Sequence, residues 1–172
     1  MDCLEGMREI PDKSVSMVLT DIPYGECSGF VLGGKNHSGL RQINKDNADY
    51  VAFSISDMAN ELMRVCSGSI YVFCGPNQFS EILNTFRNGG MTCRTCIWEK
   101  TNPSPMNGEY LWLSSVECCV FGRFPKATFH EFCKSPVWHY PCGQSNEHPT
   151  QKPVDLFRYI IRTSSNHGDT IL

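Results

Sequence analysis

The sequence predicts an α/β fold built around a mainly parallel sheet. Short apolar runs rich in β-branched residues alternate along the chain with amphipathic stretches of helical period. Strands that alternate with helices imply right-handed crossovers, which place helices on both faces of a sheet. The chain has 172 residues, of which 41% are hydrophobic and 19% charged. This is enough for a core of its own, and we expect a single domain over residues 1–172.

The first half of the chain contains two predicted strands, each followed by a predicted helix. Residues 15–20 (VSMVLT) form a short β-branched run, which is typical of a buried strand. Beyond a polar, glycine-containing stretch, residues 50–65 repeat apolar side chains at helical spacing and predict an amphipathic helix. Residues 70–74 predict the second strand, and residues 79–86 predict a helix that ends at a Gly-Gly pair.

The second half adds two strands, one helix and the start of another strand. Residues 91–99 and 116–121 predict the strands, and residues 154–163 predict a helix with one apolar side. Residues 124–148 are rich in Pro, Cys and His, and we expect them to form a long excursion from the sheet. Loops of that length usually have a function. Residues 170–172 look like the beginning of one more strand.

Composition and charge restrict the classes of protein to consider. No apolar run approaches the roughly 18 residues that span a bilayer, and the N-terminal residues lack a secretory signal. We therefore expect a cytoplasmic protein that does not bind membranes. The net charge of -3 gives no global signature of nucleic-acid binding, so such a role needs a local basic patch. The candidate patch in residues 35–45 contains Lys35, Arg41 and Lys45, but an ordinary solvated loop fits that segment equally well.

The ten cysteines do not indicate a disulfide scaffold, because such scaffolds are normally small secreted domains. Several cysteines lie inside apolar runs, where a thiol behaves as a small buried hydrophobe. Cys93 and Cys96 have the spacing of a zinc motif, but no second pair of this kind follows, and structural zinc needs four ligands. We expect reduced thiols and no bound metal. A zinc-binding interaction module is the alternative.

Two short segments carry the most specific functional signal. Residues 21–24 (DIPY) follow the first predicted strand, at the carboxyl edge of the sheet, where open α/β folds place their chemistry. Residues 148–153 (HPTQKP) precede the last predicted helix, and Pro in the first turn of a helix needs no amide partner. Taken alone, the first segment also fits a proline turn and the second an ordinary helix start.

In this order, the two segments resemble the DNA amino-methyltransferases of the permuted type, in which a catalytic tetrapeptide comes first and the cofactor-binding region last. Residues 2–24 are similar to the opening segment of that family, and residues 97–106 (IWEKTNPSPM) to its Trp-x-Lys-x-Asn-Pro-x-Pro segment, so the resemblance covers nearly the whole chain. It implies a Rossmann-like, doubly wound fold that uses S-adenosylmethionine, and a role in restriction-modification. Residues 124–147 would be the target-recognition excursion.

The resemblance assigns the reaction to residues 21–24. An exocyclic amine is a poor nucleophile, and two acceptors for its protons would direct its lone pair to the methyl group and stabilise the developing positive charge. The carboxylate of Asp21 and the carbonyl of Ile22 would be these acceptors. Pro23 would fix their orientation, and Tyr24 would stack on the flipped-out base. Ile22 replaces the first Pro of the usual motif.

The first residue of the tetrapeptide indicates which base is methylated. Asp21 resembles the N6-adenine members of the family more than the N4-cytosine members. We therefore expect methylation of adenine N6 in double-stranded DNA, with N4-cytosine as the alternative. A C5-cytosine enzyme needs a Cys nucleophile after Pro. Pro141 and Cys142 offer that dipeptide, but the tetrapeptide would then have no role.

The same resemblance assigns the cofactor and DNA contacts. S-adenosylmethionine would be bound by residues of the HPTQKP segment and of the N-terminus, namely His148, Thr150, Gln151, Lys152 and Asp2. Besides the basic patch, the DNA or the target base would be contacted by Trp98, Lys100 and Asn102. Each of these three residues also fits a strand end followed by a proline-rich turn.

The family pattern continues beyond the position of Leu172 into a glycine-rich cofactor loop. We therefore expect either a truncated chain or a complementing polypeptide that completes the cofactor pocket, and the position of Asp2 predicts a missing upstream strand. A homodimer is a further expected partner. The alternative to an enzyme is a catalytically incomplete remnant of the fold that binds DNA.

Overall fold

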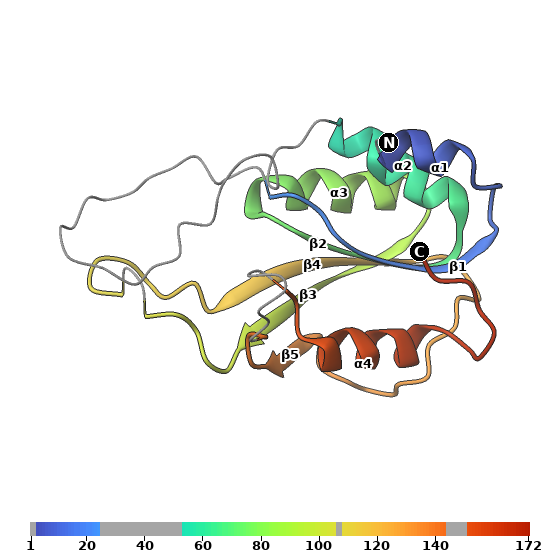
Figure 1. Cartoon of the computed structure of the whole chain (residues 1–172). Helices are drawn as coiled ribbons and strands as arrows, with labels where there is room; N and C mark the ends of the chain where they lie inside the picture. Colours follow the sequence, from blue (N-terminus) through green and yellow to red (C-terminus); the bar gives the residue numbers. More distant parts are fainter. Residues whose placement is uncertain (1–2, 25–52, 106–107, 144–150) are drawn as a thin grey trace.

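The computed structural model of the chain describes residues 3–24, 53–105, 108–143 and 151–172. Within these ranges a five-stranded sheet lies between two layers of helices (Figure 1). The strands are β1 (Val15–Asp21), β2 (Cys66–Cys74), β3 (Thr92–Lys100), β4 (Val116–Arg123) and β5 (Val137–Tyr140). The helices are α1 (Cys3–Arg8), α2 (Ile55–Val65), α3 (Pro76–Asn88) and α4 (Val154–Ser164). The predicted α/β fold is confirmed.

The strand order across the sheet is β1-β2-β4-β3-β5. β1 is parallel to β2 and β5 is parallel to β3, whereas β4 is antiparallel to both of its neighbours. Four of the five strands therefore point the same way, as the sequence predicts. β4 reverses because it follows β3 without an intervening helix, and a strand that returns without a crossover pairs antiparallel.

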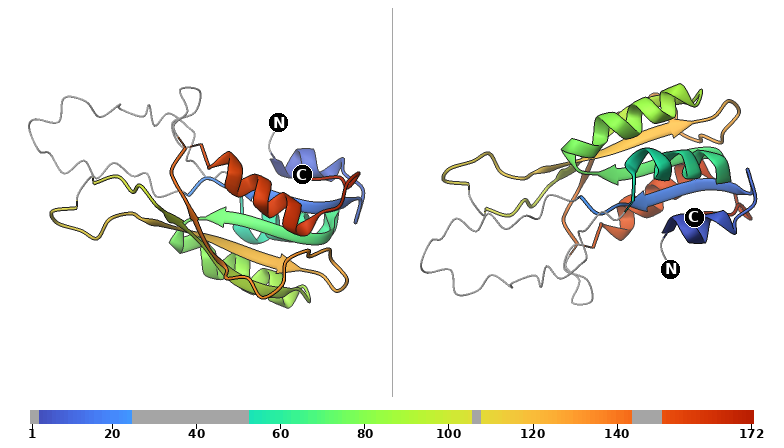
Figure 2. Two further views of the ribbon diagram at one scale, coloured as in Figure 1. Left: turned by 90° about the horizontal axis from the view of Figure 1, so that it is seen from below. Right: turned by 90° about the horizontal axis from the view of Figure 1, so that it is seen from above.

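Each face of the sheet carries its own apolar core. Helices α1, α2 and α3 cover one face and α4 covers the other (Figure 2). Val18, Ile70 and Phe86 belong to the core under the three helices. Phe73 belongs to the core under α4, where its ring stacks on that of Phe157 with 5.6 Å between centroids. The inner strand β2 is covered on both faces, which explains why its residues 70–74 are apolar without alternation.

Local capping moves the ends of two predicted helices. α2 begins at Ile55 and not at residue 50, because the Ser54 hydroxyl caps it and accepts from the Asp57 amide at 3.3 Å. Residues 50–52 lie outside the described ranges. α3 begins at Pro76, three residues earlier than predicted, since Gly75 occupies the cap position and Pro suits the first turn. The short helix α1 was not predicted.

Part of the predicted excursion belongs to the sheet, which corrects that expectation. The four residues of β5 pair in parallel with the end of β3, and the Ile97 amide donates to the Pro136 carbonyl at 2.9 Å. A strand of four residues is too short for its sequence to show a period. At the opposite side of the sheet, Ile171 forms a parallel bridge to Met17, so the predicted strand start at residues 170–172 is confirmed.

The two cysteines with zinc-like spacing face opposite sides of the sheet. Cys93 is buried in the core under α1, α2 and α3, and Cys96 in the core under α4. Because the sheet separates their thiols, this pair does not form one side of a zinc site. Among the described residues no group of three or more metal-ligating side chains occurs. The described helices also include none with the length and apolar character needed to cross a membrane.

Candidate functional site

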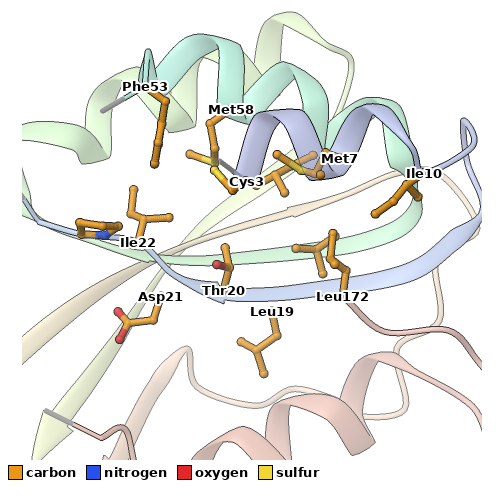
Figure 3. Close-up of a pocket in the computed structure, with 14 residues that line it drawn as sticks. Cys3, Met7, Ile10, Leu19, Thr20, Asp21, Ile22, Phe53, Met58 and Leu172 are labelled. Atoms are coloured by element: carbon orange, nitrogen blue, oxygen red, sulfur yellow. The ribbon is translucent and has the colours of Figure 1, made fainter. Parts of the chain in front are cut away.

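The DIPY segment lies where β1 ends, at the carboxyl edge of the sheet. Successive side chains of a strand point to opposite faces, and here the Asp21 carboxylate points toward α4 while Ile22 points toward α2 (Figure 3). Ile22 is buried in the core, and its amide donates to the Phe73 carbonyl at 3.2 Å. The sheet thus holds the segment, and 34% of the Asp21 side chain stays exposed.

Three charged side chains from distant parts of the sequence meet beside Asp21. The ammonium of Lys152 donates to Asp21 Oδ2 at 2.8 Å and lies 3.0 Å from Glu117 Oε2. The ammonium of Lys100 lies 2.9 Å from Glu117 Oε1. We call Asp21, Lys100, Glu117 and Lys152 the charged cluster. Its two carboxylates offset its two ammonium groups, as the partial burial of these charges requires.

Tyr24 joins the charged cluster through its hydroxyl, which donates to Glu117 Oε2 at 2.8 Å. The Lys152 ammonium lies 5.2 Å from the centroid of the tyrosine ring. Burial, together with the nearby Glu117 and Asp21 carboxylates, raises the pKa of Tyr24 far above its ordinary value. The hydroxyl therefore keeps its proton and acts as a donor.

Glu117 is held as an anion by its neighbours. Burial by itself raises the pKa of this carboxyl group, but the positive charges of Lys152 and Lys100 outweigh that effect and lower the pKa below its ordinary value. The side chain is 17% exposed and accepts from Tyr24 as well as from the two lysines. Glu117 is therefore the partly buried anchor of the site.

Helix α3 fixes the backbone of the DIPY segment. Gln78 Nε2 donates to the Pro23 carbonyl at 2.7 Å, and Gln78 Oε1 accepts from the Gly75 amide at 2.9 Å. A Cβ atom at Gly75 would lie 3.2 Å from the Cβ of Tyr24, so glycine permits this close approach. Since Gln78 occupies the Pro23 carbonyl, the Ile22 carbonyl is the better candidate for contact with a substrate.

A largely apolar cavity of about 780 Å³ lies between β1 and the helices α1 and α2 (Figure 3). Its walls include Cys3 and Met7 of α1, Phe53 before α2, and Leu172. Asp21, Ile22 and Pro23 also line it. The cavity falls in the size range of small-molecule sites, roughly 300 to 1,000 Å³. It therefore connects the DIPY segment with a space that suits a ligand of cofactor size.

One predicted site residue, Trp98, does not lie at the site. Trp98 is 2% exposed, belongs to the core under α4 and donates its indole N–H to the Tyr140 carbonyl at 2.8 Å. The prediction that the Trp98 side chain contacts DNA is therefore wrong. Alternation in β3 explains this, because Lys100 shares the face of Trp98 and reaches the charged cluster just beyond the core.

The other predicted residues divide into those the structure places and those outside the described ranges. Asn102 is exposed, and its side-chain oxygen accepts from the Cys142 amide at 2.6 Å, which ties the segment after β3 to the segment after β5. Gln151 is exposed. The residues outside the described ranges are Asp2, Lys35, Arg41, Lys45, His148 and Thr150.

Sequence reasoning missed Glu117 and Gln78. An acidic residue inside the apolar run of β4 is the signal that could have indicated Glu117, since a buried carboxylate needs partners. Gln78 had no such signal, because a polar residue in the first turn of a helix is ordinary.

Acid is expected to weaken the charged cluster and with it the fold. The pKa of Glu117 is lowered in the folded protein, so its ionisation contributes stability above the unfolded-state pKa that is lost as the pH falls through the folded-state value. We expect the urea midpoint to fall more steeply below about pH 5 in the wild type than in Glu117→Gln. Urea unfolding of both proteins at several pH values measures this, and equal slopes would contradict it.

Comparison with known proteins places the fold among DNA methyltransferases. No protein-family model matches the chain. The sequence is 27% identical to the Type II methyltransferase M.HinfI of Haemophilus influenzae over 201 residues, covering 99% of this chain and 56% of that protein. It is 26% identical to the Type II methyltransferase M.HpaI of Haemophilus parainfluenzae over 198 residues, covering 99% and 60%. The chain thus spans less than two thirds of either relative.

Solved structures match the chain over nearly its whole length. The M1.HpyAVI complex with SAM matches at a TM-score of 0.65 and 17% identity, covering 97% of this chain and 72% of that one. The cytosine-N4-specific PvuII DNA methyltransferase matches at 0.66 and 16%, covering 99% and 71%. A putative DNA modification methylase of Thermus thermophilus, complexed with S-adenosyl-L-methionine, matches at 0.61 and 17%, covering 99% and 76%. The chain therefore has the α/β fold of these DNA methyltransferases, and its sequence is similar to Type II methyltransferases.

Proposed function

We propose that the protein is a site-specific DNA methyltransferase that moves a methyl group from S-adenosylmethionine to the N6 amine of a flipped-out adenine. The observation that carries this proposal is the ion pair between Asp21 and Lys152, because it joins the DIPY and HPTQKP segments at the carboxyl edge of the sheet. Similarity to Type II methyltransferases of Haemophilus supports it.

The DIPY segment supplies the groups that an amine methylation needs. Asp21 is the more exposed of the two carboxylates in the charged cluster, so it can accept one proton of the amine. The Ile22 carbonyl would accept the other. Together they would direct the amine lone pair and stabilise the positive charge that develops on nitrogen. The Tyr24 ring, fixed through its hydroxyl, would stack on the extruded base.

The cavity between β1 and α1 is the best candidate for the methyl donor. Its apolar walls suit the adenosyl part of S-adenosylmethionine, and it reaches the DIPY segment at Ile22 and Pro23. When bound, this cofactor would supply the methyl group and keep the electron pair of the broken carbon–sulfur bond, and the methylated amine would then release one proton to water. We also propose Asp2, His148, Thr150 and Gln151 as contacts of its polar groups.

The identity of the base is the finer part of the proposal. Asp at the first position of the tetrapeptide favours adenine. One of the matched structures is that of a cytosine-N4-specific methyltransferase, which favours the second candidate, methylation of cytosine N4. The same two acceptors would serve either amine, because both amines carry two protons. Lys35, Arg41, Lys45, Lys100 and Asn102 are proposed contacts of double-stranded DNA, and a homodimer or a complementing polypeptide is a further proposal.

Transfer of labelled methyl from S-adenosylmethionine to unmethylated double-stranded DNA tests the proposal. Digestion to nucleosides should show the label in N6-methyladenine. Label in N4-methylcytosine would support the methyltransferase activity but replace adenine with cytosine as the methylated base. If the folded protein binds DNA in a salt-sensitive way without transferring label, it is a DNA-binding remnant of the fold. Stoichiometric zinc and loss of the fold with chelator would favour an interaction module.

Trp112 is the most exposed aromatic residue of the described β3–β4 connection, whereas Trp98 lies in the core under α4. The Trp112 side chain is 99% exposed, and the neighbouring Tyr110 and Leu111 are 74% and 63% exposed. Stacking of a base on an aromatic side chain contributes about 1 to 3 kcal/mol. We expect Trp112→Ala to weaken DNA binding by roughly tenfold or more and to leave the urea midpoint unchanged. Fluorescence anisotropy with labelled duplex DNA measures the affinity, and equal affinity would contradict the contact.

A further inference from the structure

Glu117 is the centre of the charged cluster, yet the proposed reaction gives it no task. It accepts from the Tyr24 hydroxyl at 2.8 Å and from Lys152 and Lys100 at 3.0 and 2.9 Å. Its side chain is 17% exposed, half the 34% of Asp21. Asp21 is therefore the end of the cluster that a substrate can reach more easily, and Glu117 is the less exposed end that holds it in place.

The charges of the cluster bear directly on an amine that becomes positively charged. With Glu117 ionised, the two carboxylates balance the two lysines. Without the charge of Glu117, the two lysines and Asp21 would give the cluster a net charge of +1. An added positive charge near the reacting nitrogen opposes methyl transfer, and it does so more strongly in a partly buried site than in water.

Glu117 also competes with Asp21 for the ammonium of Lys152. The ammonium of Lys152 lies 2.8 Å from Asp21 Oδ2 and 3.0 Å from Glu117 Oε2, so it is shared between the two carboxylates. An amine that approaches Asp21 competes with Lys152 for the carboxylate. If Lys152 moves away from Asp21, it keeps a partner in Glu117, and no buried charge is left unpaired.

We propose that Glu117 is a positioning residue for methyl transfer: it fixes Tyr24 and Lys152 relative to Asp21, and its charge keeps the site neutral so that Asp21 can accept the amine protons. This inference rests on the proposed function. It gives Glu117 an effect on the rate of the chemical step, with little effect on binding of the DNA or of the methyl donor.

Glu117→Gln keeps the shape of the side chain and removes its charge. We expect the single-turnover rate of methyl transfer to fall about tenfold or more, while the dissociation constants for DNA and S-adenosylmethionine stay within about twofold. Glu99→Gln is the matched control. Glu99 lies on β3, next to β4, but on the opposite face to Trp98 and Lys100, where it pairs with His139 at 3.1 Å. The control should keep the wild-type rate.

The double variant Glu117→Gln/Lys100→Met separates the charge from the shape. It removes one negative and one positive charge, so the cluster is neutral again. At saturating DNA, which offsets the loss of the proposed Lys100 contact, we expect it to recover most of the rate lost in Glu117→Gln. Tyr24→Phe tests the positioning part, because it removes the hydroxyl contact alone and should lower the rate without changing the charge. Urea midpoints of all variants show whether each one is folded.

The outcomes separate this inference from the proposed function. If the wild type transfers no methyl group, the proposed function fails. If the wild type is active and Glu117→Gln matches its rate, the inference fails and the function stands. A folded double variant no faster than Glu117→Gln would overturn the charge balance, and a Tyr24→Phe protein with the wild-type rate would overturn the positioning of Tyr24.

Discussion

Asp21→Asn is expected to lower the rate of methyl transfer by about 100- to 1,000-fold, the loss typical of removing one preorganised electrostatic contact from an active site. The amide keeps the shape of the carboxylate but loses its negative charge and one of its two acceptor oxygens, so it stabilises the positive charge that develops on nitrogen less well. Lys152 would keep Glu117 as a partner at 3.0 Å, so we expect the variant to fold.

Single-turnover transfer of labelled methyl to duplex DNA measures this effect. Asp155→Asn is the matched control, because Asp155 is an exposed carboxylate at the start of α4 that pairs with Arg158 on the same helix. The control should transfer methyl at the wild-type rate. Binding of S-adenosylmethionine and DNA should change little in Asp21→Asn. A rate within a few-fold of the wild type would remove Asp21 from the chemistry.

Trp98→Ala is expected to lower the free energy of unfolding by about 3 to 5 kcal/mol, the range observed when a large buried aromatic side chain is removed. Trp98 is 2% exposed in the core under α4, which also contains Trp138. The variant would leave a cavity in that core and would also remove the indole donor of the Tyr140 carbonyl, which lies 2.8 Å away on β5. We therefore expect β5 to loosen from the edge of the sheet.

Urea unfolding followed by circular dichroism measures the loss of stability. Trp112→Ala is the control, since it removes the same side chain from a 99% exposed position and should leave the midpoint unchanged. Trp98→Phe should fall between the two, because it fills part of the cavity without replacing the N–H donor. If Trp98→Ala were as stable as Trp112→Ala, the burial of Trp98 would be contradicted.

The sequence predicts the elements of the fold well where one physical signal dominates. The apolar runs of β1 and β2 and the helical spacing of α2 and α4 identify elements that the structure contains. Prediction fails where the signal is short or local. β5 has four residues and α1 has six, so each repeats its period no more than twice, which is too few repeats to identify the element. Capping by Ser54 and Gly75 decides where α2 and α3 begin.

The candidate site could be predicted only in part. Asp21 and Tyr24 follow from the position of DIPY after a strand, and Lys152 from its place before a helix. Trp98 was assigned to DNA because a motif gives the residue type but not the face of the strand. Glu117 was missed because its meaning depends on Lys100 and Lys152, which lie near it only in the folded chain.

By itself, the sequence determined the alternation of strands and helices, the position of the DIPY segment at a strand end and the likeness to one family, because each depends on residues that are neighbours along the chain. Only the tertiary structure decided that Lys152 pairs with Asp21, across 131 residues, and that Glu117 holds both lysines and Tyr24. The physical reason is that a buried charge is stable only beside its partner. The sheet, not the local sequence, brings those partners together.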